Sequence, residues 1–131
     1  MERVEGSGKL GEPTRRFYRI SQTIPPTRSD FTSHAEKGKR PREESAEAQR
    51  LWTGISVYDT LRRARKTAQL FPHLGLYIAE LQIPLHGPIV WERTTRSFGH
   101  YTLWGDPDTL LACVTAVWSP TDTEPGEKGT E

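Results

Sequence analysis

The hydrophobic pattern of this chain changes its period between residues 52 and 71. The first part of that stretch is rich in bulky and β-branched side chains, which favour a strand; they are Trp52, Ile55, Val57 and Tyr58. Further on, apolar side chains recur at the spacing of one helix face, and basic residues occupy the other faces. The apolar positions are Leu61, Ala64, Ala68 and Phe71. Asp59 and Thr60 lie between the two patterns and can cap a helix. The stretch therefore predicts a strand, a tight turn and an amphipathic helix over 60–71, with its apolar positions buried.

Short apolar runs between prolines and glycines predict the remaining elements. The expected strands cover 16–23, 76–84, 89–93, 100–104 and 113–118, and the expected short helices cover 30–37 and 106–112. Residues 39–50 are strongly charged and predict a loop with one exposed helical turn. Because short links join the later strands, at least part of the sheet must be antiparallel. The expected fold class is therefore α+β, with a mostly antiparallel sheet of about six strands and two to three helices.

Both ends of the 131-residue chain are nearly devoid of large apolar side chains. We therefore expect disordered tails at 1–15 and 121–131 around a single domain at 16–120. No apolar run approaches the roughly 18 residues that span a bilayer, and the first ten residues are too polar for a secretory signal. These features predict a cytoplasmic protein with no membrane partner.

The charge pattern argues against nucleic acid as a partner. The net charge is only +1, so there is no global field to attract a polyanion. The run KGKRPR at 37–42 is a basic cluster of a kind that can bind phosphate, but acidic residues follow it at once. We interpret this run as a solvated loop.

Several single residues could carry chemistry. His100 could position a ligand or transfer a proton, although a polar contact with the backbone is the interpretation we favour. Ser56 could contact a ligand or simply be a small residue on a packed face. Glu80 and Glu92 lie on expected strands, where each is either functional or paired with a cation, for which Arg19, Arg93 and Arg96 are the candidates. The four histidines lack metal-ligand spacing and Cys113 is the one cysteine, a small apolar residue in an apolar run, so we expect no metal and no internal disulfide.

The order of three segments resembles the core of ADP-ribosyltransferase-like domains. The segments are RFYRIS, then WTGISVYDT followed by a helix with small Ala64 and Ala68, then YIAELQIP. The resemblance covers roughly residues 17–118 and implies an NAD pocket lined by Arg19 and Ser56, with Tyr58 beside Ser56. It also implies that Glu92, in ERTT, is the catalytic carboxylate. The chain has no glutamate-x-glutamate pair, and His100 with Tyr101 stands where some relatives carry another final residue. As a whole the chain resembles a small bacterial protein.

The resemblance and the residues together lead to two hypotheses. The first is a transferase or glycohydrolase that acts on NAD or an ADP-ribosyl group. In that case Glu92 would stabilise the positive charge that develops on the ribose, Arg19 would pair with a phosphate, and His100 is the second catalytic candidate. The second is a non-enzymatic interaction domain that binds a protein or a nucleotide in the same cleft. A carboxylate facing Arg19 distinguishes them, because catalysis requires it and binding does not.

Overall fold

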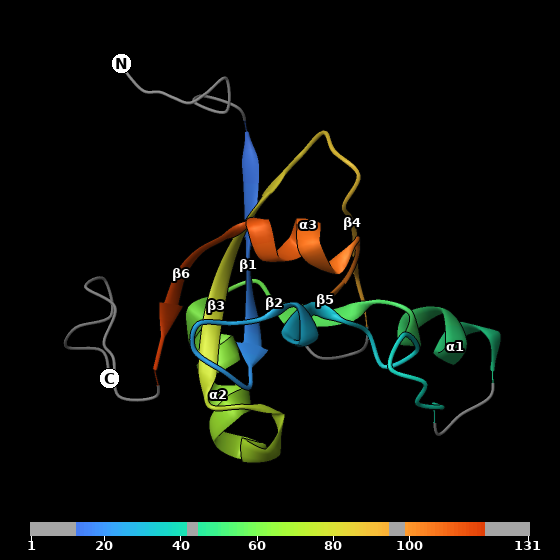
Figure 1. The fold of residues 1–131 in the computed structure, drawn as a ribbon, viewed down its shortest axis with the longest axis horizontal. Helices are drawn as coiled ribbons and strands as arrows, with labels where there is room; N and C mark the ends of the chain where they lie inside the picture. The colour runs from blue at the N-terminus through green and yellow to red at the C-terminus, as the bar shows by residue number, and fades with distance from the viewer. Residues whose placement is uncertain (1–12, 42–44, 95–98, 120–131) are drawn as a thin grey trace.

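The computed structural model describes residues 13–41, 45–94 and 99–119. Its elements are β1 (Thr14–Ser21), the 3₁₀ helix η2 (Arg28–Phe31), α1 (Ala46–Trp52), β2 (Ile55–Tyr58), α2 (Leu61–Leu70), the 3₁₀ helix η3 (Pro72–Leu74), β3 (Tyr77–Pro84), β4 (Val90–Arg93), β5 (His100–Trp104), α3 (Pro107–Ala112) and β6 (Val114–Trp118). The strands form one sheet in the order β4-β5-β2-β1-β3-β6, and every neighbouring pair is antiparallel (Figure 1). The predicted α+β class with an antiparallel sheet is confirmed.

The ladder between β1 and β2 is much shorter than the one between β1 and β3. Strand β1 pairs with β3 along its whole length, from Thr14 opposite Pro84 to Ser21 opposite Tyr77. Its register with β2 consists of a single pair, Tyr18 opposite Tyr58. No further residues of β1 and β2 are paired, although β2 stays paired with β5 along its whole length, from Tyr58 to Ile55. The middle of the sheet is therefore open on one side of Tyr18, and the candidate site lies at this opening.

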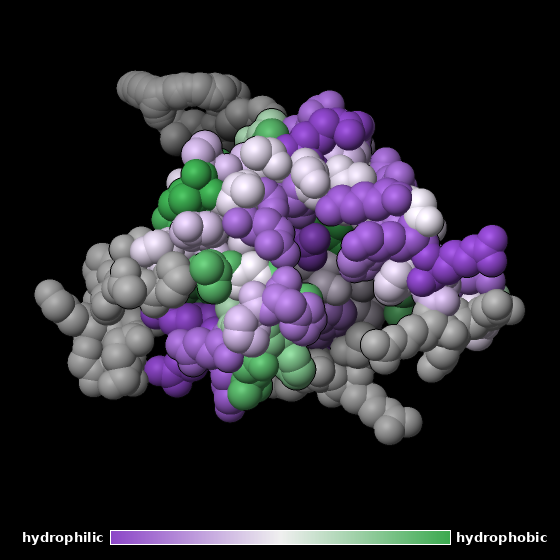
Figure 2. Space-filling view, turned by 60° about the horizontal axis from the view of Figure 1, so that its bottom comes forward, coloured by the Kyte–Doolittle hydropathy of each residue, from purple (hydrophilic) through white to green (hydrophobic). Residues whose placement is uncertain are grey.

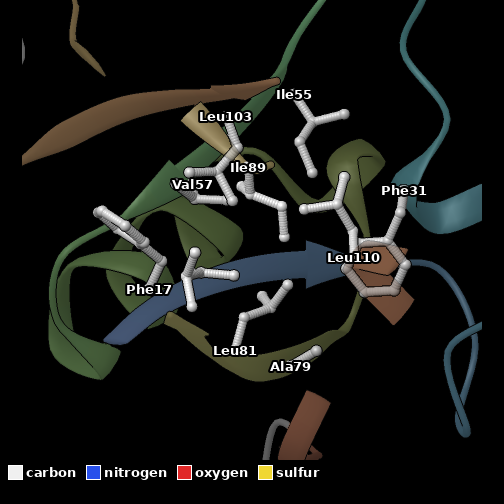
Figure 3. Close-up of a cluster of buried hydrophobic side chains, with 10 residues drawn as sticks. Phe17, Phe31, Ile55, Val57, Ala79, Leu81, Ile89, Leu103 and Leu110 are labelled. Carbon is white, nitrogen blue, oxygen red and sulfur yellow. The ribbon is translucent and has the colours of Figure 1, made fainter. Parts of the chain in front are cut away.

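Two hydrophobic clusters cover the two faces of the sheet. On one face, side chains from the strands pack with Phe31 of η2 and Leu110 of α3, as Figure 3 shows. The buried members of this cluster are Phe17, Phe31, Ile55, Val57, Ala79, Leu81, Ile83, Ile89, Leu103 and Leu110. On the other face, Leu61 and Ala64 of α2 pack on Tyr18, Ile20 and Ile78. The half-buried Cys113 packs at the margin of the first cluster.

The helix starts lie where the capping residues predict them. The Thr60 side chain accepts a hydrogen bond from the backbone of Arg63, and Asp106 accepts from the backbone of Asp108 and Thr109. Each cap satisfies an N–H group that the first turn leaves unpaired. Helix α2 ends at Leu70 because Pro72 cannot continue it, and Gly75 then turns the chain with φ at 144°. A Cβ atom at Gly75 would clash with the carbonyl of Ser21, so only glycine fits this turn.

Two predicted segments differ from the structure. The helix expected over 30–37 is wrong, because a short 3₁₀ helix at Arg28–Phe31 and a turn over 34–38 replace it. The Asp30 carboxylate binds the backbone N–H groups of Gln22 and Thr27, which folds this segment into a compact loop. The strand expected from Trp52 begins only at Ile55. Trp52 instead ends α1, a longer helix than the single turn we expected, which starts at the Ser45 cap.

The buried face expected for α2 is wrong at its end. Leu61 and Ala64 are buried and Ala68 is half-buried, but the Phe71 side chain is 50% exposed. Phe71 is the C-cap residue, with ψ at 73°, so it no longer follows the helical spacing that would aim it at the sheet. Among the described residues, an apolar surface is therefore exposed at the end of α2.

The expected tails lie outside the described residues, except for residues 13–15, of which Thr14 and Arg15 already belong to β1. Within the described ranges, none of the helices has the length and apolar composition that crossing a bilayer requires.

Leu81 and Phe71 provide a test of this assignment of core and surface. Leu81→Ala should lower the free energy of unfolding by about 2–5 kcal/mol, because Leu81 is fully buried and its truncation leaves a cavity. Phe71→Ala should cost less than about 1 kcal/mol, as surface substitutions usually do. Urea unfolding followed by tryptophan fluorescence measures both, and a larger loss for Phe71→Ala than for Leu81→Ala would contradict the packing described here.

Candidate ligand-binding site

Two adjoining cavities open where β1 and β2 separate, and we call them together the Arg19 hollow. Their volumes are about 330 Å³ and 240 Å³. Arg19, His34, Lys37 and Ser56 line both of them. The first is also lined by Asp30, Lys39, Tyr58 and His73, and the second by Trp52, His100 and Thr102. The hollow thus combines residues from β1, β2 and β5 with the loop over 32–39.

The Arg19 guanidinium lies in the opening between β1 and β2. Its Nε donates to the Asp30 carbonyl at 2.9 Å, and its Nη1 donates to the Ser56 carbonyl at 2.9 Å. Burial lowers the pKa of Arg19 to about 10, an effect that the charge of Asp30 and the Tyr58 hydroxyl partly offset. The group therefore stays protonated at neutral pH. Because both hydrogen bonds end on neutral carbonyl groups, neither of them neutralises its charge.

Ser56 and Tyr58 contribute to the hollow from the other face of the sheet. Tyr18 lies opposite Tyr58, so the side chains of Tyr58 and Ser56 leave the sheet on the Tyr18 face and Arg19 leaves it on the opposite face. Arg19 and Ser56 both line the hollow because the ladder is open between them. What Arg19 binds directly is the backbone of Ser56, not its hydroxyl.

A tight loop places three more ionisable side chains on the hollow. The backbone N–H of Lys37 donates to Ser33 and that of Lys39 donates to His34, with Gly38 between them at a φ of 82°. The His34 ring stacks on Trp52 with 4.5 Å between centroids. Burial lowers the pKa of His34, and the positive charges of Lys39, Arg19 and Lys37 lower it further. The hollow therefore has a positive potential that favours an anion.

Among the described residues that line the hollow, Asp30 is the one carboxylate, and its oxygens are already used. Oδ1 accepts from the Gln22 backbone at 2.8 Å, and Oδ2 accepts from the Thr27 backbone at 2.9 Å and the Thr23 hydroxyl at 2.8 Å. Burial by itself raises the pKa of Asp30, but these hydrogen bonds and the charge of Arg19 lower it below the ordinary value. Asp30 therefore holds the loop together as a carboxylate.

His100 is partly buried at the margin of the hollow. Its Nδ1 lies 3.1 Å from the Thr94 carbonyl and 3.2 Å from the Thr94 hydroxyl, which is itself 2.7 Å from the Thr102 hydroxyl. The ring makes a T-shaped contact with the ring of Tyr58, with 5.4 Å between centroids. Burial lowers the pKa of His100, although the backbone contact with Thr94 acts in the opposite direction. A carbonyl group can only accept, so this geometry puts the hydrogen of the neutral ring on Nδ1.

Neither glutamate candidate lines the hollow. Glu92 is half-exposed on β4, where its Oε1 lies 2.6 Å from Nη2 of Arg50, an arginine that the sequence did not indicate as its partner. Glu80 is buried on β3, where Tyr18 donates to it at 3.0 Å and Thr115 at 2.5 Å. Both carboxylates therefore have structural partners.

The structure thus brings Arg19, Ser56, Tyr58 and His100 to one hollow and leaves Glu92 outside it. Sequence reasoning missed His34, Lys37 and Lys39 as site residues. The signal that could have identified them was the basic run at 37–42. The charge pattern led to the interpretation of this run as a solvated loop, because acidic residues follow it.

No protein-family model, curated protein or solved structure matches this chain. The resemblance to ADP-ribosyltransferase-like domains therefore stays a prediction. In the part of the chain that the structure describes, no three His, Cys, Asp or Glu side chains are grouped so that they could hold a metal ion.

Asp30→Asn tests whether this carboxylate holds the loop. The substitution should destabilise the fold by about 1–3 kcal/mol at neutral pH, because an amide cannot accept from every donor around Asp30. The folded pKa is below the unfolded value of about 3.9, so this stabilisation is complete above that pH and is lost as the pH falls through the folded pKa. Urea unfolding across this range should therefore show a difference between the two proteins that shrinks in acid. A difference that does not change with pH would contradict this role.

Proposed function

We propose that this chain is a binding domain that holds a phosphate-bearing nucleotide, of the class of NAD or ADP-ribose, in the Arg19 hollow. The observation that carries the proposal is the convergence of Arg19, His34, Lys37 and Lys39 on a hollow whose lining carboxylate, Asp30, is already engaged. Several cationic side chains that outnumber the neighbouring carboxylate attract a polyanion and bind phosphate oxygens directly.

Aromatic side chains and the size of the neighbouring cavities favour a nucleotide over inorganic phosphate. Tyr58 lines one part of the hollow and Trp52 the other. A third cavity, of about 660 Å³, shares Lys39 with the first part and Trp52 with the second. A ligand with its phosphates at Lys37 and Lys39 would therefore have both room and an indole ring for a base, which stacks well on aromatic rings.

Binding is proposed ahead of turnover because of the position of Glu92. An enzyme that cleaves the nicotinamide–ribose bond needs a carboxylate at the developing positive charge. Glu92 is paired with Arg50 and is not among the residues that line the hollow. Transfer or hydrolysis with Glu92 and His100 in catalytic roles stays the alternative, with NAD as its substrate.

Reversing two charges at the hollow should abolish most of the affinity. We expect wild-type protein to bind ADP-ribose and NAD in isothermal titration, and Lys37→Glu with Lys39→Glu to weaken binding by about tenfold or more, equivalent to about 1.4 kcal/mol. Both lysines are exposed, so the fold should remain intact. The matched control is Arg62→Glu with Lys66→Glu, the same charge change at exposed positions of α2 that do not line the hollow.

The ionisation of His34 gives a second readout of the same binding event. A bound phosphate should raise the pKa of His34, because it offsets the positive charges that now lower it. NMR titration of the ring protons measures this shift. No heat at millimolar nucleotide and an unchanged His34 titration, with the protein folded, would refute the proposal.

Glu92→Gln separates binding from turnover. The substitution should leave nucleotide affinity unchanged, because Glu92 does not line the hollow. Incubation with NAD, followed by chromatography of nicotinamide, measures turnover in both proteins, and we expect none from either. Release of nicotinamide by the wild type that Glu92→Gln removes would replace the binding domain by the enzymatic alternative.

A further inference from the structure

In the part of the chain that the structure describes, the end of α2 exposes a group of large apolar side chains. The exposed fractions are 63% for Leu70, 50% for Phe71, 39% for Leu74 and 54% for Leu76. The four lie within seven consecutive residues, and we call them the apolar end of α2. Figure 2 shows hydrophobic surface beside strongly hydrophilic surface on this side of the molecule. Soluble proteins seldom leave large contiguous apolar patches without a partner.

A cavity of about 170 Å³ opens beside this surface, between the end of α2 and the sheet. Its walls are mostly apolar and include Ala68, Pro72, Leu76 and Ile78. Its volume suits one large apolar side chain. Such a cavity next to exposed apolar residues is the arrangement in which a single anchor side chain contributes most of the affinity of a protein interface.

The charged side chains of helix α2 itself all have one sign. Helix α2 carries Arg62, Arg63, Arg65 and Lys66 and no acidic residue. Arg62 and Lys66 are exposed, and they precede Leu70 at successive steps of four residues, so the three form one ridge along the helix. Two copies of this surface facing each other would bring like charges together, which disfavours self-association and favours an acidic partner.

We propose that the apolar end of α2 is a docking site for an acidic peptide segment of a partner protein, which inserts one large apolar side chain into the neighbouring cavity. Carboxylates on both sides of that anchor pair with Arg62 and Lys66. The cavity argues for a protein anchor over a bilayer surface, because insertion into lipid uses protruding side chains and needs no recess. The docking proposal does not depend on the nucleotide proposal, although the two surfaces share Leu74, which also lines the Arg19 hollow.

The test uses a fluorescein-labelled peptide in which one phenylalanine is flanked on both sides by glutamates, followed by anisotropy. Two control peptides replace the phenylalanine by alanine or the glutamates by lysines. We expect saturable binding of the first peptide to the wild-type chain and about tenfold weaker binding of either control. Added salt should weaken binding of the first peptide, because the flanking contacts are between exposed charges.

Two variants locate the binding. Phe71→Ser with Leu76→Ser removes apolar surface, and Arg62→Glu with Lys66→Glu reverses the charge; each should weaken the peptide by about tenfold without lowering the melting temperature substantially. The control is Lys37→Glu with Lys39→Glu, which should leave peptide binding unchanged while it weakens nucleotide binding. The two proposals can therefore fail independently.

Three results would overturn the docking site. The first is no saturable binding of the phenylalanine peptide. The second is equal binding of either control peptide, or no effect of both α2 variants. The third is that the protein does not bind the peptide but sediments with phosphatidylserine vesicles, and that the variant Phe71→Ser with Leu76→Ser no longer sediments. That result would assign the surface to an anionic bilayer instead.

Discussion

The position of Arg19 is the constraint on which the middle of this structure depends. Its guanidinium joins the loop at Asp30 to strand β2 at Ser56, where the ladder between β1 and β2 has already ended. Without these two hydrogen bonds, the loop at Asp30 would lose this link to β2 at the point where the ladder opens. Arginine suits this place because its rigid fork can donate in two directions at once. Lysine, with a compact ammonium group, could not span the same pair of carbonyls with the same geometry.

The same arrangement explains why the opening has a positive potential. An arginine held by two carboxylates would be electrically compensated, whereas an arginine held by two carbonyl groups keeps its charge. The nearest carboxylate, Asp30, is turned toward backbone N–H groups of its own loop. Lys37 and Lys39 then add to the charge from the turn at Gly38, and their charges lower the pKa of His34 further than its burial alone does. Structure and proposed function therefore rest on one feature, the use of neutral acceptors for a partly buried cation.

The molecule has two surfaces of different chemistry, and they meet at η3. His73 and Leu74 line the Arg19 hollow, and Leu74 also belongs to the apolar end of α2. Gln22 holds this junction, because its side chain donates to the carbonyls of His73 and Leu74 at 3.2 Å and 2.9 Å. The cationic hollow is suited to an anionic ligand, and the apolar end to a large apolar side chain. A variant at Leu74 would therefore alter both surfaces.

The local sequence determined the elements whose signals are contained within a few residues. Strand-forming residue types in short runs between prolines and glycines predicted the six strands. The caps at Thr60 and Asp106 predicted where two helices begin, because a cap and the N–H groups it satisfies are neighbours in the chain. Arg19, Ser56, Tyr58 and His100 could be singled out as candidates from residue type and strand position. What only the tertiary structure decided depends on residues far apart in sequence. The loop after β1 folds around Asp30 instead of forming a helix, Phe71 faces solvent although its spacing predicts burial, and Glu92 pairs with Arg50 outside the hollow. The basic run at 37–42 read as solvated because its charge is balanced along the chain, yet Lys37 and Lys39 lie beside Arg19 in space. Charge balance along a sequence does not determine the potential in a cavity, because the fold decides which charges face it.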